Sequence, residues 1–221
     1  VVAIWEFIPI WPGMLPKFEI FSAANGIRIY LFAIAGNAAM GIDPARLEML
    51  SALNRKVLWL SSWTIHHANH IRPNTDGLKV GGHQASSASL ANIMSALYFS
   101  VLRPQDRVAV KPHASPVFHA IQYLFGHQTR DKLENFRGYK GAQSYPSRTK
   151  DVDDVDFSTG SVGLGVAMTL FSSLVQDYVR LKELGDGKRQ GSEYRAGRMG
   201  ALVGDAELGE GNIFEALLGG W

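Results

Sequence analysis

Short apolar runs that alternate with amphipathic helical segments constrain the fold of this chain most strongly. The clearest run, Met199–Val203, ends directly in Gly204 and Asp205. A second run, residues 108–110, leads into a Lys-Pro-His segment. Because strands that alternate with helices usually pair in parallel, the pattern predicts an α/β fold with a parallel sheet flanked by helices.

Helix signals separate these runs. Asp43 can cap a helix whose first position is Pro44, and later helices begin at small-residue loops. A polar stretch over residues 138–162 includes an acidic run from Asp151 to Asp156, and loops of this length are usually functional. The helices expected from the patterns span residues 44–62, 81–101, 115–126, 129–138, 163–183 and 213–218.

Composition excludes several classes of protein. The 221 residues are 46% hydrophobic and 19% charged, which is typical of a globular chain. With no cysteine, the chain has neither disulfides nor a thiolate metal site. A net charge of +2 gives no nucleic-acid footprint, and the longest apolar stretch is too short to cross a bilayer. We expect a cytoplasmic protein with no nucleic-acid or membrane partner.

Residues 1–40 differ from the rest, because aromatic side chains and prolines are scattered there without a period of 2 or 3.6. Two interpretations stay open. The segment is an apolar arm that packs on a partner, or it lies upstream of a natural start at Met40. The expected division is therefore an atypical segment over residues 1–40 and a domain over residues 41–221.

Gly204 and Asp205 at the end of the last apolar run are the strongest chemical signal. Ligands of open α/β sheets bind at the carboxyl ends of strands, and a carboxylate there can join Mg²⁺ to phosphate oxygens. An ordinary turn aspartate is the alternative. The glycine-rich turn at residues 160–165 either holds an anion or is a tight turn.

Two of the seven histidines, His83 and His113, stand in small-residue loops before helices, where a ligand would bind. We predict that their side chains converge on one site. The other five are expected to be surface or satisfied core residues. His66 and His70 are four apart and can share a helix face, but no third metal ligand is indicated.

Five segments in one order resemble the amino-terminal region of the homodimeric pyruvate dehydrogenase decarboxylating component and, more broadly, the transketolase-like thiamine diphosphate enzymes. The resemblance covers residues 44–221 and implies the thiamine-diphosphate-binding fold. The segments are Gly-Gly-His-Gln-Ala-Ser-Ser from residue 81, His-Ala-Ser-Pro from 113, Ser-Tyr-Pro from 144, Ser-Val-Gly-Leu-Gly from 161 and Gly-Asp-Ala-Glu from 204.

The resemblance also implies roles for individual residues. Asp205 would bind Mg²⁺, and His83 and His113 would act in catalysis above the thiazolium ring. Glu210 matches an acidic residue that links the two sites of a transketolase dimer. The remaining residues implied to bind the cofactor are Ser86, Ser161, Val162, Gly163, Gly204, Ala206 and Glu207.

The activity that the resemblance implies is oxidative decarboxylation of pyruvate or a related 2-oxo acid by a homodimer that uses thiamine diphosphate and Mg²⁺. A lipoyl acyltransferase component would be its partner. Transketolase, which transfers a two-carbon ketol unit between sugar phosphates, is the first alternative. An inactive remnant that acts as an interaction module is the second.

Departures from the family pattern set two further expectations. Ala206 stands where the family usually has glycine. If the position needs a positive φ, alanine lowers the stability of the fold by about 1 kcal/mol, and otherwise the change has no cost. The family's motif continues to an asparagine, and its activating glutamate lies in a later domain; neither is found in this sequence. We therefore expect an amino-terminal fragment, incomplete at its C-terminus and inactive alone.

Overall fold

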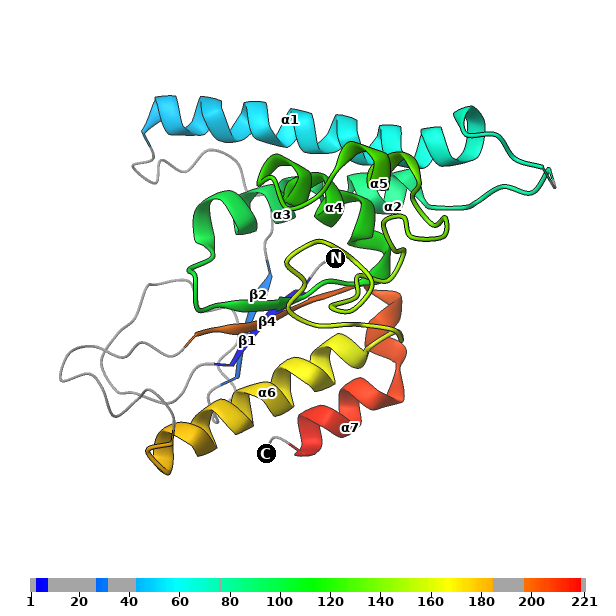
Figure 1. Ribbon diagram of the computed structural model, residues 1–221. Helices are drawn as coiled ribbons and strands as arrows, with labels where there is room; N and C mark the ends of the chain where they lie inside the picture. The colour runs from blue at the N-terminus through cyan, green and yellow to red at the C-terminus, as the bar shows by residue number, and fades with distance from the viewer. Residues whose placement is uncertain (1–2, 8–26, 32–42, 76, 185–196, 220–221) are drawn as a thin grey trace. The chain divides into compact units, whose positions relative to one another are not determined.

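The structure is a computed structural model that describes residues 3–7, 27–31, 43–75, 77–184 and 197–219 (Figure 1). The chain divides into two compact units, and each is described by itself. The sheet unit contains Val1–Phe32, Arg103–Ala109 and Ser161–Trp221. The helical unit contains Ala33–Leu102 and Val110–Gly160. Met40 lies outside the described residues, so the two interpretations of the amino-terminal segment stay predictions.

The sheet has four strands in the order β2-β1-β4-β3. The predicted parallel pairing is confirmed for β3 with β4, but β1 pairs antiparallel with both β4 and β2. The sheet is therefore mixed, because two strands come from the amino-terminal segment, where no strand period was recognised. The strands are β1 (Ala3–Phe7), β2 (Ile27–Leu31), β3 (Arg107–Ala109) and β4 (Met199–Val203).

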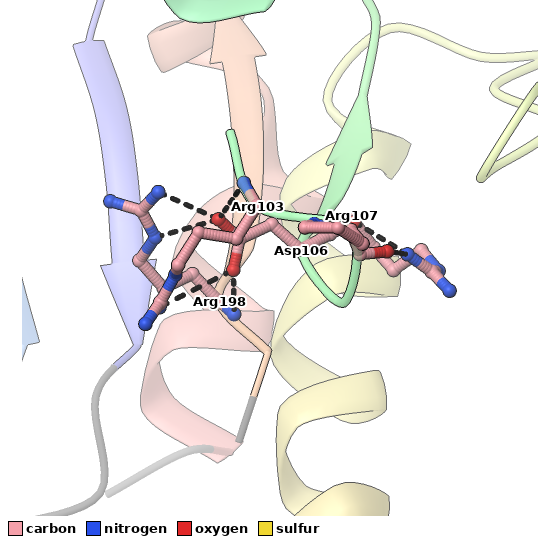
Figure 2. A network of polar contacts seen from close by, with 5 residues as sticks. Arg103, Asp106, Arg107 and Arg198 are labelled. Carbon is pink, nitrogen blue, oxygen red and sulfur yellow. Dashed lines mark hydrogen bonds and ion pairs between the residues drawn. The ribbon is translucent and has the colours of Figure 1, made fainter. Parts of the chain in front are cut away.

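The β3–β4 register is fixed at its amino end by Asp106, which is buried between two arginines (Figure 2). One carboxylate oxygen accepts bonds from the Arg103 backbone N–H at 2.9 Å and from the Arg198 side chain at 2.6 and 3.0 Å. The other oxygen accepts from the Arg198 backbone N–H at 2.8 Å. Beside it, a Cβ on Gly197 would lie 2.0 Å from the Gln105 carbonyl oxygen, so only glycine fits there.

Two helices complete the described part of the sheet unit. α6 (Leu164–Leu181) packs against β3 and β4, and it lies beside α7 (Gly211–Gly219) (Figure 1). The first half of the expected apolar face of α6 is buried at Val166 and Leu170. The second half, Leu174, Tyr178 and Leu181, is exposed.

In the helical unit, α1 (Pro44–His66) packs against the three helices α2, α3 and α4 (Figure 1). Asp43 caps α1 as predicted, because its carboxylate accepts the Ala45 N–H at 3.2 Å. The other elements are η1 (His67–Ile71), α2 (Gln84–Ala88), α3 (Ala91–Ala96), η2 (Leu97–Val101), η3 (Pro112–Ala114), α4 (Ser115–Leu124) and α5 (Arg130–Glu134).

Three helix predictions were wrong in extent. The helix expected over residues 129–138 ends at Glu134, because the backbone leaves the helical conformation at Asn135. The first helix continues past residue 62 into η1, whose side chains are mostly polar, so the apolar period did not mark its end. The helix expected over residues 81–101 begins at Gln84 and breaks near Ser89. The Ser89 hydroxyl donates to the Ser86 carbonyl at 2.8 Å, and such local bonds compete with the helical ladder.

The predicted long loop is confirmed, since residues 135–163 contain no helix or strand. In the middle of this loop, the Asp151 carboxylate accepts hydrogen bonds from the backbone N–H groups of Gln143 and Ser147 at 2.9 and 2.8 Å. Thr159 anchors its end, because the buried hydroxyl donates to the Val110 carbonyl at 2.7 Å. Among the helices in the described ranges, none has the length and apolar character needed to cross a bilayer.

Candidate functional site

The side chains of His83 and His113 meet in the helical unit. Their ring centroids lie 5.3 Å apart with an interplanar angle of 89°, so the edge of one imidazole faces the other. Both residues are exposed. The prediction that these two histidines converge is confirmed, and both are exposed to solvent.

The backbone before His83 adopts a conformation that requires glycine. Gly81 and Gly82 have φ values of +88° and +105°, which side chains with a Cβ rarely adopt. Asn69 of η1 holds this loop in place: its amide donates to the Gly81 carbonyl at 3.0 Å and its oxygen accepts the Gly81 N–H at 2.9 Å. His83 then precedes α2, which carries the exposed Ser86.

His113 lies in η3, a short turn that leads directly into α4. The Ala114 N–H donates to the Lys111 carbonyl at 2.9 Å and closes this turn. Because η3 packs against α2, the two histidine loops are held by contacts between short elements. Sequence reasoning found both histidines but missed Asn69, whose only signal was its place in a polar stretch.

In the sheet unit, Asp205 follows β4 directly, as predicted. Asp205 and Ala206 are exposed, while Gly204 is buried. The Glu207 carboxylate is also buried and accepts the Gly204 N–H at 2.5 Å, so it holds the turn from inside. Ala206 is not among the described residues with a positive φ, so the expected 1 kcal/mol cost of replacing glycine does not arise.

The turn at residues 161–163 contacts the start of α7. Gly163 precedes α6 with φ +79°, and a Cβ there would lie 2.3 Å from Oδ1 of Asn212. The Asn212 amide donates to the Val162 carbonyl at 3.1 Å, while its buried Oδ1 has no hydrogen-bond partner among the described residues. Asn212 therefore joins this turn to the segment that follows Asp205 and the exposed Glu210.

The turn after β4 fits a Mg²⁺–diphosphate group in the chemistry of its donors. Among the described residues, no side chain pairs with the Asp205 carboxylate, so its oxygens are open to a cation. η5 (Ala206–Gly209) begins there, and the N–H groups of Glu207 and Leu208 donate to the Gly204 and Asp205 carbonyls at 3.1 and 3.2 Å, which leaves the Ala206 N–H as the candidate donor to a phosphate oxygen. A carboxylate beside such an N–H group can bind Mg²⁺ and a phosphate oxygen together.

The predicted site residues thus form two sets. The helical unit brings His83 and His113 together, with Ser86 on the adjoining helix. The sheet unit contains Gly204 to Glu207, Glu210 and the turn at 161–163. The roles that the resemblance implies for all of these residues stay predictions.

A buried polar cluster in the helical unit was not predicted. His119 contacts Asp153 through Nδ1, and its Nε2 donates to the Gln143 carbonyl at 2.7 Å. Burial alone would lower the pKa of His119, but the hydrogen bond and charge of Asp153 outweigh burial and raise this pKa. Burial raises the pKa of nearby Asp151. The acidic run from Asp151 to Asp156 was the only sequence signal for this cluster. His119 itself was expected to be a satisfied core residue, as it is.

The other histidine prediction concerned His66 and His70. Their rings lie 4.9 Å apart on one helical face, as expected. Among the described residues, the groups of three or more side chains that can hold a metal ion do not include this pair.

The helices and the small sheet with its parallel β3–β4 pair are consistent with an α/β protein. Comparison with known proteins identifies proteins that are similar to this chain. No protein-family model matches the chain. It is 27% identical over 176 residues to the pyruvate dehydrogenase E1 component of Escherichia coli strain K12, a match that covers 76% of this chain and 18% of the relative.

Other relatives carry the same name. The E1 component of Mycolicibacterium smegmatis is 28% identical over 165 residues, which cover 70% of this chain and 16% of the relative. The E1 component of Cupriavidus necator is 32% identical over 143 residues, which cover 59% of this chain and 15% of the relative. The matches thus span less than a fifth of these relatives. The chain is a distant relative of pyruvate dehydrogenase E1 components.

Proposed function

We propose that this chain carries the cofactor-binding part of a thiamine diphosphate- and Mg²⁺-dependent enzyme that oxidatively decarboxylates pyruvate or a related 2-oxo acid. The observation that supports it most is the exposed pair of His83 and His113, which stand 5.3 Å apart in a chain related to E1 components. Paired imidazoles can deliver and accept protons near neutral pH.

Asp205 is proposed to bind Mg²⁺. Its carboxylate is exposed at the end of β4, and the Ala206 N–H beside it is proposed to bind a diphosphate oxygen. The bond from Gly204 to the buried Glu207 holds that turn in one conformation before ligand binds. Ser161, Val162 and Gly163 are proposed to contact the aminopyrimidine ring, supported by the rigid turn that Asn212 holds.

When bound, thiamine diphosphate stabilises the carbanion that decarboxylation produces. His83 and His113 are proposed to hold and move protons at their ring nitrogens, with Ser86 orienting the substrate. CO₂ leaves, and the remaining unit is at the oxidation level of an aldehyde. The lipoyl disulfide of an acyltransferase oxidises this unit to an acyl group: the S–S bond breaks, one sulfur forms the thioester, and the other becomes a thiol. The proposal includes a homodimer, in which Glu210 links the two sites, and a cytoplasmic location.

Binding of thiamine diphosphate to the 221-residue chain tests the proposal. Titration calorimetry in a buffer that contains Mg²⁺ should show binding of thiamine diphosphate that chelation of the metal removes. Asp205→Ala should abolish it, whereas Glu48→Ala, which removes an exposed carboxylate from α1, should leave it unchanged.

Binding that is independent of Mg²⁺, or that survives Asp205→Ala, would contradict the assignment of Asp205. The reaction itself is tested by the acceptor. Transfer of the two-carbon unit to lipoamide supports the dehydrogenase, and transfer to an aldose phosphate supports the transketolase alternative.

A further inference from the structure

The cluster of the buried His119 and Asp153 with the half-buried Asp151 carries more negative charge than its protein partners neutralise. The side chains of His119 and Asp153 are fully buried. No lysine or arginine within the described ranges forms an ion pair with either aspartate. Even with His119 protonated, two carboxylates face one imidazolium, and uncompensated buried charge is costly.

One oxygen of the cluster also lacks a partner. Oδ2 of Asp153 contacts Nδ1 of His119 and accepts the Gln128 amide at 2.9 Å. Oδ1 of the same carboxylate is buried and has no hydrogen-bond donor among the described residues. Buried polar atoms in proteins almost always have a partner, so this orphaned oxygen indicates that the cluster holds a further positive group.

The hydrogen bonds around the cluster resemble those that hold metal-binding side chains in place. Metal-binding histidines typically donate their other ring N–H to a backbone carbonyl, and Nε2 of His119 faces the Gln143 carbonyl at 2.7 Å. Carboxylate ligands are likewise held by hydrogen bonds, and Asp151 accepts two backbone N–H groups.

We propose that Nδ1 of His119 and the carboxylates of Asp151 and Asp153 bind a divalent first-row transition metal ion of the Zn²⁺ or Mn²⁺ class. One donor atom from each residue lies within 4.8 Å of the others. Donors around a tetrahedral Zn²⁺ stand about 3.4 Å apart, so the cluster contracts on binding. A mixed imidazole and carboxylate set suits these metals better than Ca²⁺, which prefers oxygen alone.

The bound ion would neutralise both aspartates and replace the proton shared by His119 and Asp153. It would also join α4, which begins just after His113, to the loop at residues 143–153. Its role is therefore structural, and it does not depend on the proposed function or on Asp205.

Zinc binding by the purified chain tests the site. The parent is a His66→Gln, His70→Gln chain, because this exposed helical pair can bind Zn²⁺ adventitiously. After chelation and dialysis, we expect the parent to bind one Zn²⁺ per chain. Asp151→Asn, at a partly exposed position, should weaken binding at least about 10-fold. The control Glu48→Gln, which neutralises an exposed carboxylate on α1, should bind as the parent does.

Absence of stoichiometric Zn²⁺ and Mn²⁺ binding would overturn the proposal and show that a proton alone occupies the cluster. Binding unchanged by Asp151→Asn would place the ion elsewhere and also overturn it. Circular dichroism without zinc establishes that the variant is folded. If it is not, X-ray absorption of the zinc-loaded parent decides: one imidazole with oxygen ligands supports the site, and two or more imidazoles contradict it.

Discussion

Replacing Asp106 with asparagine should destabilise the protein by about 3 kcal/mol, because it removes the charge that fixes the start of β3 to the start of β4. An asparagine has one acceptor oxygen where the carboxylate has two. In either amide orientation, an NH₂ group faces the backbone N–H of Arg103 or of Arg198, which both now donate to Asp106.

The magnitude follows from these contacts. A buried donor left without its acceptor costs about 1–3 kcal/mol. Loss of the charge-assisted bonds from the guanidinium groups adds about 1 kcal/mol, discounted because the Arg103 and Arg198 side chains are 37% and 27% exposed and can be hydrated. The sum is close to the 3–5 kcal/mol that is typical when one partner of a buried ion pair is removed.

The effect should depend on pH in a defined direction. Burial alone would raise the pKa of Asp106, but its hydrogen bonds with Arg198 and Arg103 outweigh burial and hold this pKa below its ordinary value. A depressed pKa contributes stability that is fully present above the unfolded pKa, about 3.9. This stability is lost as pH falls through the lower, folded pKa, so the difference between wild type and Asp106→Asn should shrink below about pH 4.

Urea unfolding at pH 7 and at several lower pH values measures both effects. Glu134→Gln is the matched control, because the Arg130–Glu134 bond is 2.7 Å long but exposed and should contribute less than about 1 kcal/mol. Equal losses in the two variants, or a loss for Asp106→Asn that grows on acidification, would refute the reasoning.

Three further variants test other parts of the account. Gly163→Ala should lower the free energy of unfolding by about 1–3 kcal/mol, because the backbone has φ +79° there and the new Cβ would clash with Asn212. Gly160→Ala should lower it little, because the space around that Cβ is open. Equal urea midpoints for the two variants would contradict this. Ala206→Gly should destabilise by about 0.5–1 kcal/mol because the position does not need a positive φ, and a stabilised variant would show that it does. In a preparation that turns over a 2-oxo acid, His113→Ala should lower kcat about 10²–10⁴-fold with little change in cofactor affinity. The control His66→Ala should leave kcat unchanged. A loss confined to cofactor affinity would assign His113 to binding.

The sequence predicted the elements whose signals are local. Met199–Val203 is an uninterrupted apolar run, and Asp43 with Pro44 is a direct helix-start signal, so both were placed correctly. The convergence of His83 and His113 was also predicted, from two small-residue loops that precede helices, and contacts between the short elements η3 and α2 bring these loops together.

Features that depend on contacts distant in sequence were not predictable. The pairing of β1 with β4 joins segments almost the whole chain apart, and no local pattern marks it. Asn69, Asn212 and the cluster around His119 act through a few hydrogen bonds to backbone groups of other loops. Such bonds leave no period in the sequence, so only the folded structure shows them.

The central claim is that Asp205 and the turn after β4 bind the Mg²⁺–diphosphate end of thiamine diphosphate. Crystals of the chain grown with thiamine diphosphate and Mn²⁺ in place of Mg²⁺ test it most directly, since anomalous scattering locates the manganese. We predict a peak at coordination distance, about 2.1 Å, from a carboxylate oxygen of Asp205, with phosphate density beside the N–H group of Ala206. Cofactor density whose diphosphate lies away from this turn, or a loaded crystal without manganese at Asp205, would contradict it.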